Sequence, residues 1–408
     1  MATSTLSPYR GPAPSHAGSG TPPFAGWPGF SPEDVEAVSR VLASGRVNYW
    51  TGDECKQLER EYAAAIGVRH AVTVTNGTLA LELALRALGV GPGDEVIVTP
   101  RSFIASASSA VICGAVPIFA DIDRDSQNLT ANTIEARLTP RTKAIIAVHL
   151  AGWPCEMDSI LELARSHNLS VIEDCAQAHG AAYKGSPVGS MGRINAFSFC
   201  NDKIISTGGE GGLVTTNEEA LWRRAWSYKD HGKDYDSACK KPLSRGYRFL
   251  HHDFGSNWRM LEVQGALGRR HLAKLPAWVA ARRHNAAILS EAFRRLAALR
   301  VTDPPDHIFH SYYKYYVFVR PEALRADWDR DRILEAIREA GVPCYSYYGE
   351  MYREKAFVKY GLAPSEPLPV AKALAETALV FLVHPTLSSE AVHYAAETAA
   401  RVVSNATR

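Results

Sequence analysis

The chain has 408 residues, 46% of them apolar, and its 45 basic side chains nearly balance its 43 acidic ones. This length allows a large domain and a smaller one, and the balanced charge argues against a nucleic-acid partner. No run approaches the roughly 18 apolar residues of a membrane-spanning helix. The seven cysteines are scattered without a C-x-x-C pair, which predicts free thiols in a cytoplasmic protein.

The N-terminal residues 1–30 are rich in Ser, Pro, Gly and Ala and lack the apolar core of a signal peptide. They are predicted to form a mobile tail. Ser31 then caps a helix, because Pro32 stands at its first position, acidic residues fill its first turn, and Gly45 follows its last apolar residue.

From residue 71 to residue 173, short apolar strands alternate with helices. The predicted strands are 72–75, 95–98, 117–120, 144–150 and 169–173, and the predicted helices are 79–88, 103–113, 130–138 and 157–167. This alternation predicts an α/β fold with a mostly parallel sheet covered by helices on both faces. Ligands of such sheets bind beyond the carboxyl ends of the strands.

The C-terminal third has a different pattern. A helix is predicted over 218–228, a long helical region over 261–300 with a break near Pro276, a strand over 312–319, and helices over 329–340 and 370–379. The sequence therefore predicts a large domain, 31–274, and a small α+β domain, 275–408.

Two of the predicted strands end in residues suited to a cofactor. Asn76, Gly77 and Thr78 would place backbone N–H groups and a hydroxyl at a helix N-terminus, where phosphate binds, although an ordinary capped turn has the same pattern. Phe103 could lie against a planar ring, or it could be a core residue.

Asp174 and Gln177 follow the strand that ends at residue 173. A carboxylate at the end of a buried strand needs a cation or hydrogen-bond donors, and a pyridinium nitrogen is such a partner. Gln177 could donate to a ring oxygen of the same cofactor. A helix N-cap and a surface amide are the alternatives for these two residues.

Lys203 follows an aromatic strand, and a turn with four glycines among five residues, 208–212, comes next. Glycine allows positive φ and close approach of backbone, so this turn suits a lysine that is held rigidly in a pocket. Lys203 is the candidate for a Schiff base with a cofactor, and a surface lysine before a flexible hairpin is the alternative. Phosphate donors at residues 76–78, then the carboxylate of Asp174, then Lys203 follow one another along the chain. Together they predict a pyridoxal phosphate (PLP) pocket.

The chain resembles the DegT/DnrJ/EryC1/StrS sugar aminotransferases, which are PLP enzymes of fold type I. The resemblance extends from about residue 31 to the C-terminus. The residues that carry it are Asn76-Gly77-Thr78-Leu79-Ala80-Leu81, Gly93-Asp94-Glu95-Val96-Ile97, Glu173-Asp174-Cys175-Ala176-Gln177-Ala178-His179-Gly180, Ser198-Phe199 with Lys203, Glu210-Gly211-Gly212, and Asn257-Trp258-Arg259-Met260.

The resemblance implies a role for each matched residue around the cofactor ring. Lys203 would form the Schiff base and then move the proton, and Asp174 would pair with the pyridine nitrogen. Gln177 would contact the ring hydroxyl, and Phe103 would stack on the ring. Lysine at position 203 argues against the dehydratase branch of the family, which has histidine there.

The resemblance also implies how the phosphate is held. Gly77, Thr78 and Ser198 would bind it, and Asn257 would reach the phosphate of a neighbouring subunit. The protein would then be a homodimer with shared active sites. Two departures from the family pattern concern Gly208-Gly209, where one glycine is usual, and Trp258, where tyrosine is frequent.

The implied reaction is a two-stage transamination in which glutamate or glutamine gives an amino group that a keto-sugar, linked to a nucleoside diphosphate, then accepts. A keto-cyclitol or amino-shikimate type of acceptor is one alternative, and a non-enzymatic regulator that kept the fold is another. A Rossmann oxidoreductase and a P-loop kinase are disfavoured, because neither glycine motif is present.

Four residues are candidates for substrate contacts. Lys229, His231 and Arg248 belong to a basic segment that could hold a diphosphate or could be an ordinary solvated loop, and the resemblance places His179 near the substrate. No metal site is predicted, since adjacent residues such as His251-His252-Asp253 rarely bind one ion together.

Overall fold

The structure is a computed structural model, and it describes residues 22–240 and 249–408. A seven-stranded sheet forms the centre of the larger part of the molecule. Its strand order is β1-β9-β8-β5-β4-β2-β3, and all neighbours are parallel except those of β9. The strands are β1 (His70–Val74), β2 (Glu95–Val98), β3 (Val116–Phe119), β4 (Thr142–Val148), β5 (Ser170–Asp174), β8 (Ile194–Ser198) and β9 (Gly212–Thr216). This sheet confirms the predicted α/β architecture.

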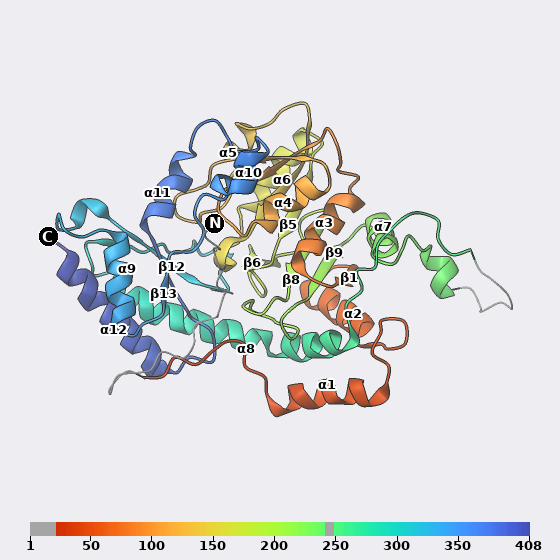
Figure 1. The fold of residues 1–408 in the computed structure, drawn as a ribbon, viewed down its shortest axis with the longest axis horizontal. Coiled ribbons are helices and arrows are strands. Elements are labelled where there is room, and N and C mark those ends of the chain that lie inside the picture. The colour runs from red at the N-terminus through yellow and green to blue at the C-terminus, as the bar shows by residue number, and fades with distance from the viewer. Residues whose placement is uncertain (1–21, 241–248) are drawn as a thin grey trace, which may run out of the picture.

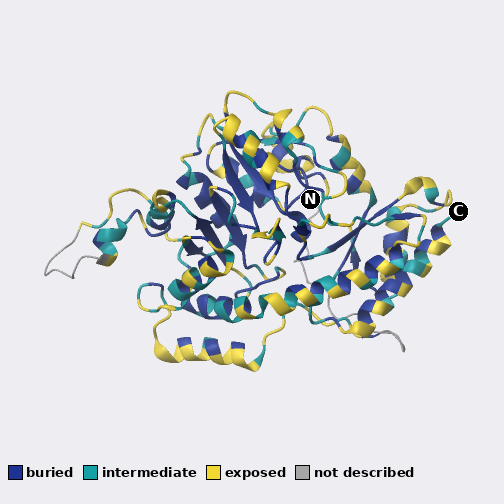
Figure 2. Ribbon diagram, turned by 180° about the vertical axis from the view of Figure 1, so that it is seen from behind, coloured by how far each residue is buried: buried dark blue, intermediate teal, exposed yellow. Residues whose placement is uncertain are grey.

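Helices cover the sheet, and its strands are buried (Figures 1 and 2). These helices are α2 (Glu54–Ile66), α3 (Gly77–Ala87), α4 (Ala105–Ile112), α5 (Ala131–Glu135), α6 (Met157–Ser166) and α7 (Glu219–Lys229). The near-continuous apolar strands need this cover, because a parallel sheet buries both faces. Among the described residues, no helix combines the length and apolarity needed to cross a membrane.

The smaller part contains a four-stranded antiparallel sheet in the order β10-β12-β14-β13. Its elements are β10 (Leu299–Arg300), β12 (Tyr315–Val319), β13 (Cys344–Tyr345), β14 (Ala378–Phe381), α9 (Arg330–Glu339), α11 (Pro369–Thr377) and α12 (Ser389–Ala406). A three-stranded sheet joins β6 (Ala182–Tyr183), β7 (Ser186–Pro187) and β11 (Ile308–Phe309), and α10 (Lys355–Lys359) packs on the large core through Phe357.

One helix, α8 (Glu262–Phe293), connects the two parts (Figure 1). The break predicted near Pro276 is wrong, because the helix continues through this proline. Packing of α8 against α1, α2 and α12 holds the helix together where proline removes one hydrogen bond. The predicted domain boundary at 274/275 falls inside α8, and the division into two domains stays a prediction.

The described end of the predicted tail packs against both parts of the protein. The indole Nε1 of Trp27 donates to the carbonyl oxygen of Lys203 at 2.7 Å, and the hydroxyl of Thr386 donates to the carbonyl of Gly26 at 2.9 Å. Residues 22–30 therefore lie on the structured body, whereas residues 1–21 are outside the described residues. The predicted capped helix is present as α1 (Pro32–Ser44).

The hydrophobic core of the smaller part, in which the end of α8 packs against β14, can be tested by mutation. Phe293 is fully buried at the end of α8, with its ring 5.2 Å from that of Phe381. Phe293→Ala should lower the free energy of unfolding by about 3–5 kcal/mol, measured by urea denaturation, because it leaves a cavity. The control Phe309→Ala, at a ring that is 45% exposed, should cost less than about 1 kcal/mol. Equal losses would contradict the packing.

Candidate active site

Lys203 lies in the turn after β8, with its side chain 12% exposed. Its Nζ atom is 3.3 Å from the hydroxyl oxygen of Tyr313 and 3.4 Å from a carboxylate oxygen of Asp202. The Tyr313 hydroxyl donates in turn to Asp202. Lys203 therefore sits where the large part meets the segment before β12, rather than on an open surface.

The glycine turn after Lys203 has a conformational reason. Gly208 and Gly209 have φ values of +86° and +115°, which side chains other than glycine rarely adopt. A Cβ atom on Gly211 would lie 2.1 Å from the Thr207 hydroxyl, and one on Gly212 would lie 2.3 Å from the carbonyl oxygen of Asn76. The second glycine, unexpected from the resemblance, is thus required by two successive positive φ angles.

Asp174 is the last residue of β5 and is 4% exposed. One carboxylate oxygen accepts from the Ser106 hydroxyl at 2.7 Å and the other from the Ala176 N–H at 3.1 Å. Burial raises the pKa of this carboxyl, although these two donors and the charge of Lys203 partly offset the effect. A cation placed against Asp174 would favour its ionised form.

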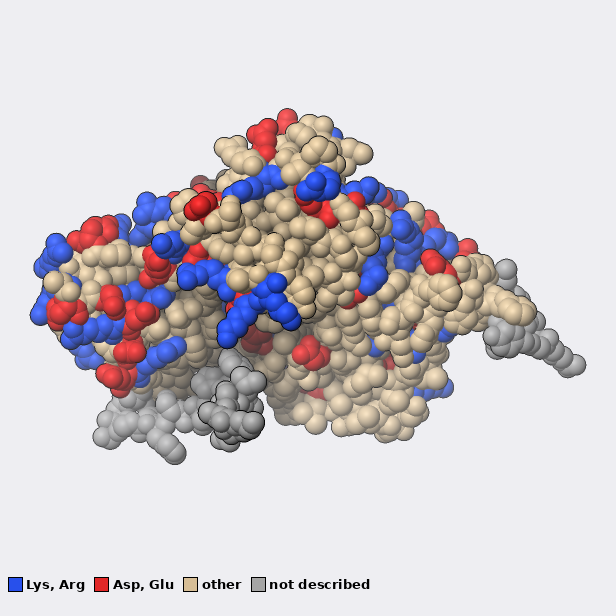
Figure 3. Space-filling view, turned by 45° about the horizontal axis from the view of Figure 1, so that its top comes forward, with Lys and Arg blue, Asp and Glu red and all other residues tan. Residues whose placement is uncertain are grey.

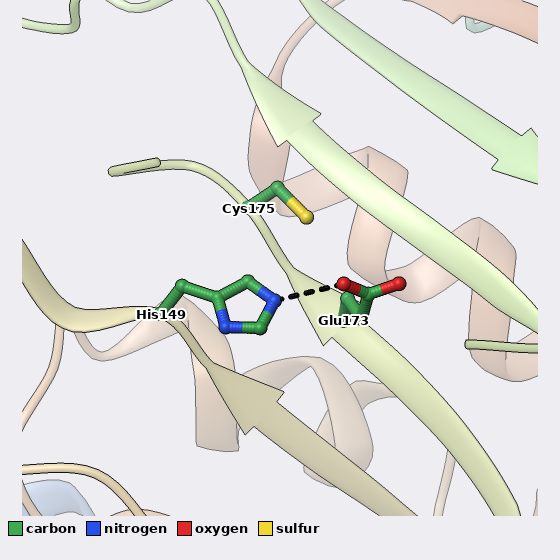
Figure 4. Close-up of side chains that lie close together, drawn as sticks. All are labelled: His149, Glu173 and Cys175. Carbon is green, nitrogen blue, oxygen red and sulfur yellow. Dashed lines mark hydrogen bonds and ion pairs between the residues drawn. The ribbon is translucent and has the colours of Figure 1, made fainter. Parts of the chain in front are cut away.

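Beside Asp174, a buried group of His149, Glu173 and Cys175 has the atoms of a metal site (Figure 4). The Cys155 N–H donates to Nδ1 of His149 at 3.0 Å, so Nε2 carries the proton and donates to Glu173 at 2.9 Å. Both ring nitrogens are thereby engaged. The group fixes the end of β5, where Glu173 also accepts three backbone N–H bonds, from Gly189, Met191 and Gly192.

The predicted phosphate-binding residues meet at one corner. Gly77 and Thr78 begin α3, and the Asn76 side chain accepts from the Leu79 N–H at 2.9 Å, which leaves the first N–H groups of the helix directed outward. A Cβ atom on Gly77 would lie 2.5 Å from that of Ser198. Only glycine therefore allows the helix N-terminus to approach the end of β8.

Gln177 and Phe103 lie at the same edge of the sheet. The Gln177 carbonyl oxygen accepts from the Ala151 N–H at 2.9 Å, and its amide donates to the Tyr348 hydroxyl at 3.2 Å. Phe103 precedes α4 and is 58% exposed, so the core alternative for this ring is wrong. Its exposure leaves a face free for a planar ligand.

The structure does not support substrate contacts by His179 and Lys229. Nδ1 of His179 accepts from the Tyr62 hydroxyl and Nε2 donates to the Ser198 carbonyl, both at 2.8 Å, and burial lowers its pKa to about 4. Lys229 is fully buried, 3.4 Å from the Glu59 carboxylate and 3.6 Å from the centre of the Tyr49 ring. Both side chains are occupied inside the protein.

The other predicted contacts lie on the segment after α7. His231 is exposed with φ +60°, and its carbonyl oxygen lies 2.8 Å from Nδ1 of His251. Asn257 is exposed, although the Trp258 carbonyl next to it accepts from the Thr75 N–H at 3.1 Å and so reaches the end of β1. Arg248 lies outside the described residues.

Three residues at the site were not predicted from the sequence. Ser106 binds Asp174, Tyr313 binds Lys203, and Tyr348 binds Gln177. Ser106 stands one helical turn after Phe103, so its place on a strand-end helix was a usable signal. Tyr313 and Tyr348 come from distant segments, and no local pattern distinguishes them from the surrounding tyrosines.

These residues fit PLP. The pKa of the buried Asp174 carboxyl is raised despite its neighbours, the glycine at position 77 keeps a helix N-terminus accessible beside Ser198, and the ring of Phe103 is exposed. The protonated pyridine nitrogen of PLP would pair with Asp174, its phosphate would lie at the helix N-terminus, and its planar ring would lie against Phe103.

Comparisons with known proteins agree with this geometry. A model of the DegT/DnrJ/EryC1/StrS aminotransferase family matches residues 30–399. GDP-perosamine synthase of Escherichia coli O157:H7 is 35% identical over 372 residues, which are 91% of this chain and 96% of that protein. 3-Amino-5-hydroxybenzoate synthase of Amycolatopsis mediterranei (strain S699) is 35% identical over 351 residues, 85% of this chain and 86% of that protein.

A solved structure gives the same result. The X-ray structure of the aminotransferase from Psychrobacter cryohalolentis is 52% identical, with a TM-score of 0.92, and the match covers 94% of this chain and all of that one. The family and the type I fold predicted from the sequence are thereby confirmed. The chain belongs to the DegT/DnrJ/EryC1/StrS aminotransferase family and is a PLP-dependent aminotransferase.

Proposed function

We propose that the protein transfers an amino group from glutamate or glutamine to a keto-sugar carried by a nucleoside diphosphate. The observation that carries this proposal is the position of Lys203 and Asp174. The amine lies in the turn after β8, and the buried carboxylate ends β5, the parallel neighbour of β8. The similarity to GDP-perosamine synthase supports a nucleotide-linked sugar as the acceptor.

PLP, when bound, supplies a protonated ring that takes up the electron pair left when the donor loses its Cα proton. Lys203 would bind the cofactor covalently and, once released, move this proton. Asp174 would keep the ring nitrogen protonated, held in place by Ser106 and the Ala176 N–H. Gln177 would contact the ring hydroxyl, and Phe103 would cover one face of the ring.

The phosphate group would lie at the corner formed by α3 and the end of β8. Gly77 and Thr78 would donate from the helix N-terminus and Ser198 from its hydroxyl, where the helix dipole favours an anion. This grip would fix the cofactor when Lys203 is free during turnover. His231 and Arg248 remain candidates for the diphosphate of the acceptor.

A second copy of the chain would complete each site. Asn257 is exposed, and Phe254 close to it is 94% exposed, as expected of a segment that a partner covers. Asn257 would then reach the phosphate bound by the other subunit.

All seven cysteines are free, which supports a cytoplasmic location.

An aromatising acceptor is the second candidate, and the similarity to 3-amino-5-hydroxybenzoate synthase favours it. This acceptor would carry no nucleotide. Affinity for nucleoside diphosphates therefore separates the two candidates.

The acceptor is tested with the cofactor-loaded enzyme. Keto-sugars linked to GDP or UDP should convert its pyridoxamine form back to the pyridoxal form, followed by visible absorbance, and the free nucleotides should compete. Lys203→Ala should lose about 10²-fold or more of the rate, because the amine proposed to move the proton is removed. Conversion of a keto-cyclitol, with no binding of either nucleotide, would contradict the nucleotide-sugar proposal.

Asp174→Asn should have opposite effects on stability and activity. Burial raises the pKa of this carboxyl above its ordinary value, so in the cofactor-free protein the group opposes folding increasingly as pH rises from that ordinary value. Replacing it with a neutral amide should therefore raise the unfolding temperature at pH 7. Turnover should fall by orders of magnitude, because the ring nitrogen loses its counter-ion. An unchanged turnover rate would disprove the role of Asp174.

The shared site is tested by mixing Lys203→Ala chains with Asn257→Ala chains. If Asn257 acts across the interface, each heterodimer has one intact site, and activity should rise above that of either parent. Reassembly is followed by size-exclusion chromatography, with each variant mixed with itself as control. Heterodimers that form without a gain in activity would place Asn257 in its own subunit's site.

A further inference from the structure

Two lysines share one aromatic ring beside the proposed cofactor. The Nζ atoms of Lys203 and Lys314 lie 4.9 Å and 4.8 Å from the centre of the Tyr313 ring. Lys314 comes directly before β12, and its Nζ atom also lies 5.6 Å from the Tyr347 ring. Within 22–240 and 249–408, no carboxylate lies within ion-pair distance of Lys314.

Arg282 of α8 adds a third cation behind this ring. It is 1% exposed, and its Nη1 donates to the Tyr313 carbonyl oxygen at 3.2 Å. Its Nε and Nη2 atoms are buried without a hydrogen-bond acceptor, and its guanidinium faces the Trp27 ring at 5.1 Å. A buried guanidinium with free N–H groups is costly unless an anion is near.

The charges of this cationic cluster, Lys203, Arg282 and Lys314, do not cancel. The carboxylate in contact with it is that of Asp202, which already accepts from Tyr313 and lies beside Lys203. Burial lowers the pKa of Lys314 to about 8 and that of Arg282 to about 9, so the positive surplus is held at a cost. On the face shown in Figure 3, by contrast, basic and acidic side chains lie among one another.

We propose that Lys314, with the charge of Arg282 behind it, binds the carboxylate of the amino donor and thereby places the donor's amino group beside Lys203. The inference rests on the proposed function. Every amino acid donor brings a carboxylate, and one ammonium group supported by a buried guanidinium matches a single negative charge. The phosphate corner at α3 lies on the large part, so the two anions are held by different elements.

The test uses the cofactor-loaded enzyme and three small-molecule probes. Glutarate binds without reacting and is followed by calorimetry; L-glutamate is followed by the change in visible absorbance in a single turnover. Lys314→Met should weaken both apparent affinities by about 10- to 100-fold. Butylamine, which has no carboxylate, should react with the lysine-bound cofactor at the unchanged rate.

Two variants control for charge and structure. Lys314→Arg keeps the positive charge and should retain most of the glutarate affinity, whereas Lys359→Met removes an exposed lysine elsewhere and should change nothing. The inference is overturned if Lys314→Met binds glutarate and glutamate normally, or if its reaction with butylamine slows as much as that with glutamate. A Lys314→Met variant impaired only with the acceptor would assign Lys314 to acceptor binding and also overturn the inference. None of the three probes contains a ketone, so failure of the keto-sugar proposal gives a separate result.

Discussion

A carboxylate buried at the end of β5 is the constraint on which the site depends. Asp174 is desolvated, and Ser106 and one backbone N–H offset only part of that penalty, because the pKa of the group remains raised. The neighbouring Glu173 is also buried, but His149 and three backbone N–H groups donate hydrogen bonds to its carboxylate. These donors lower its pKa, although burial alone would raise it. The protein's own groups thus fully compensate the burial of the Glu173 carboxylate, whereas the Asp174 carboxylate would need a cation for the same compensation.

The position of Lys203 follows from backbone that must come unusually close. Gly77, Gly211 and Gly212 leave no room for a Cβ atom, and Gly208 and Gly209 adopt positive φ angles. These glycines bring the N-terminus of α3 against the ends of β8 and β9. The lysine turn and the phosphate corner are therefore one rigid unit, which suits a cofactor held at both ends.

In the proposed function, the small part would contribute the side of the site that faces the substrates. Tyr313 and Lys314 stand before β12, Tyr348 reaches Gln177, and α8 carries Arg282. Trp27 links these elements, because its indole N–H donates to the Lys203 carbonyl oxygen and its ring packs against Trp278 of α8. Donor selection would then depend on how the small part sits on the large one, and cofactor binding mainly on the large part.

The sequence by itself determined the α/β order and the strand ends, and it predicted roles for Lys203, Asp174 and Gly77, because each depends on local patterns of apolar strands, caps and glycines. The tertiary structure decided what those patterns cannot encode. It engaged both nitrogens of His179, buried Lys229 against Glu59, and carried α8 through Pro276 by packing on three helices. It also brought Tyr313, Lys314 and Arg282 to Lys203 across long sequence separations, a result of how two cores pack on one helix.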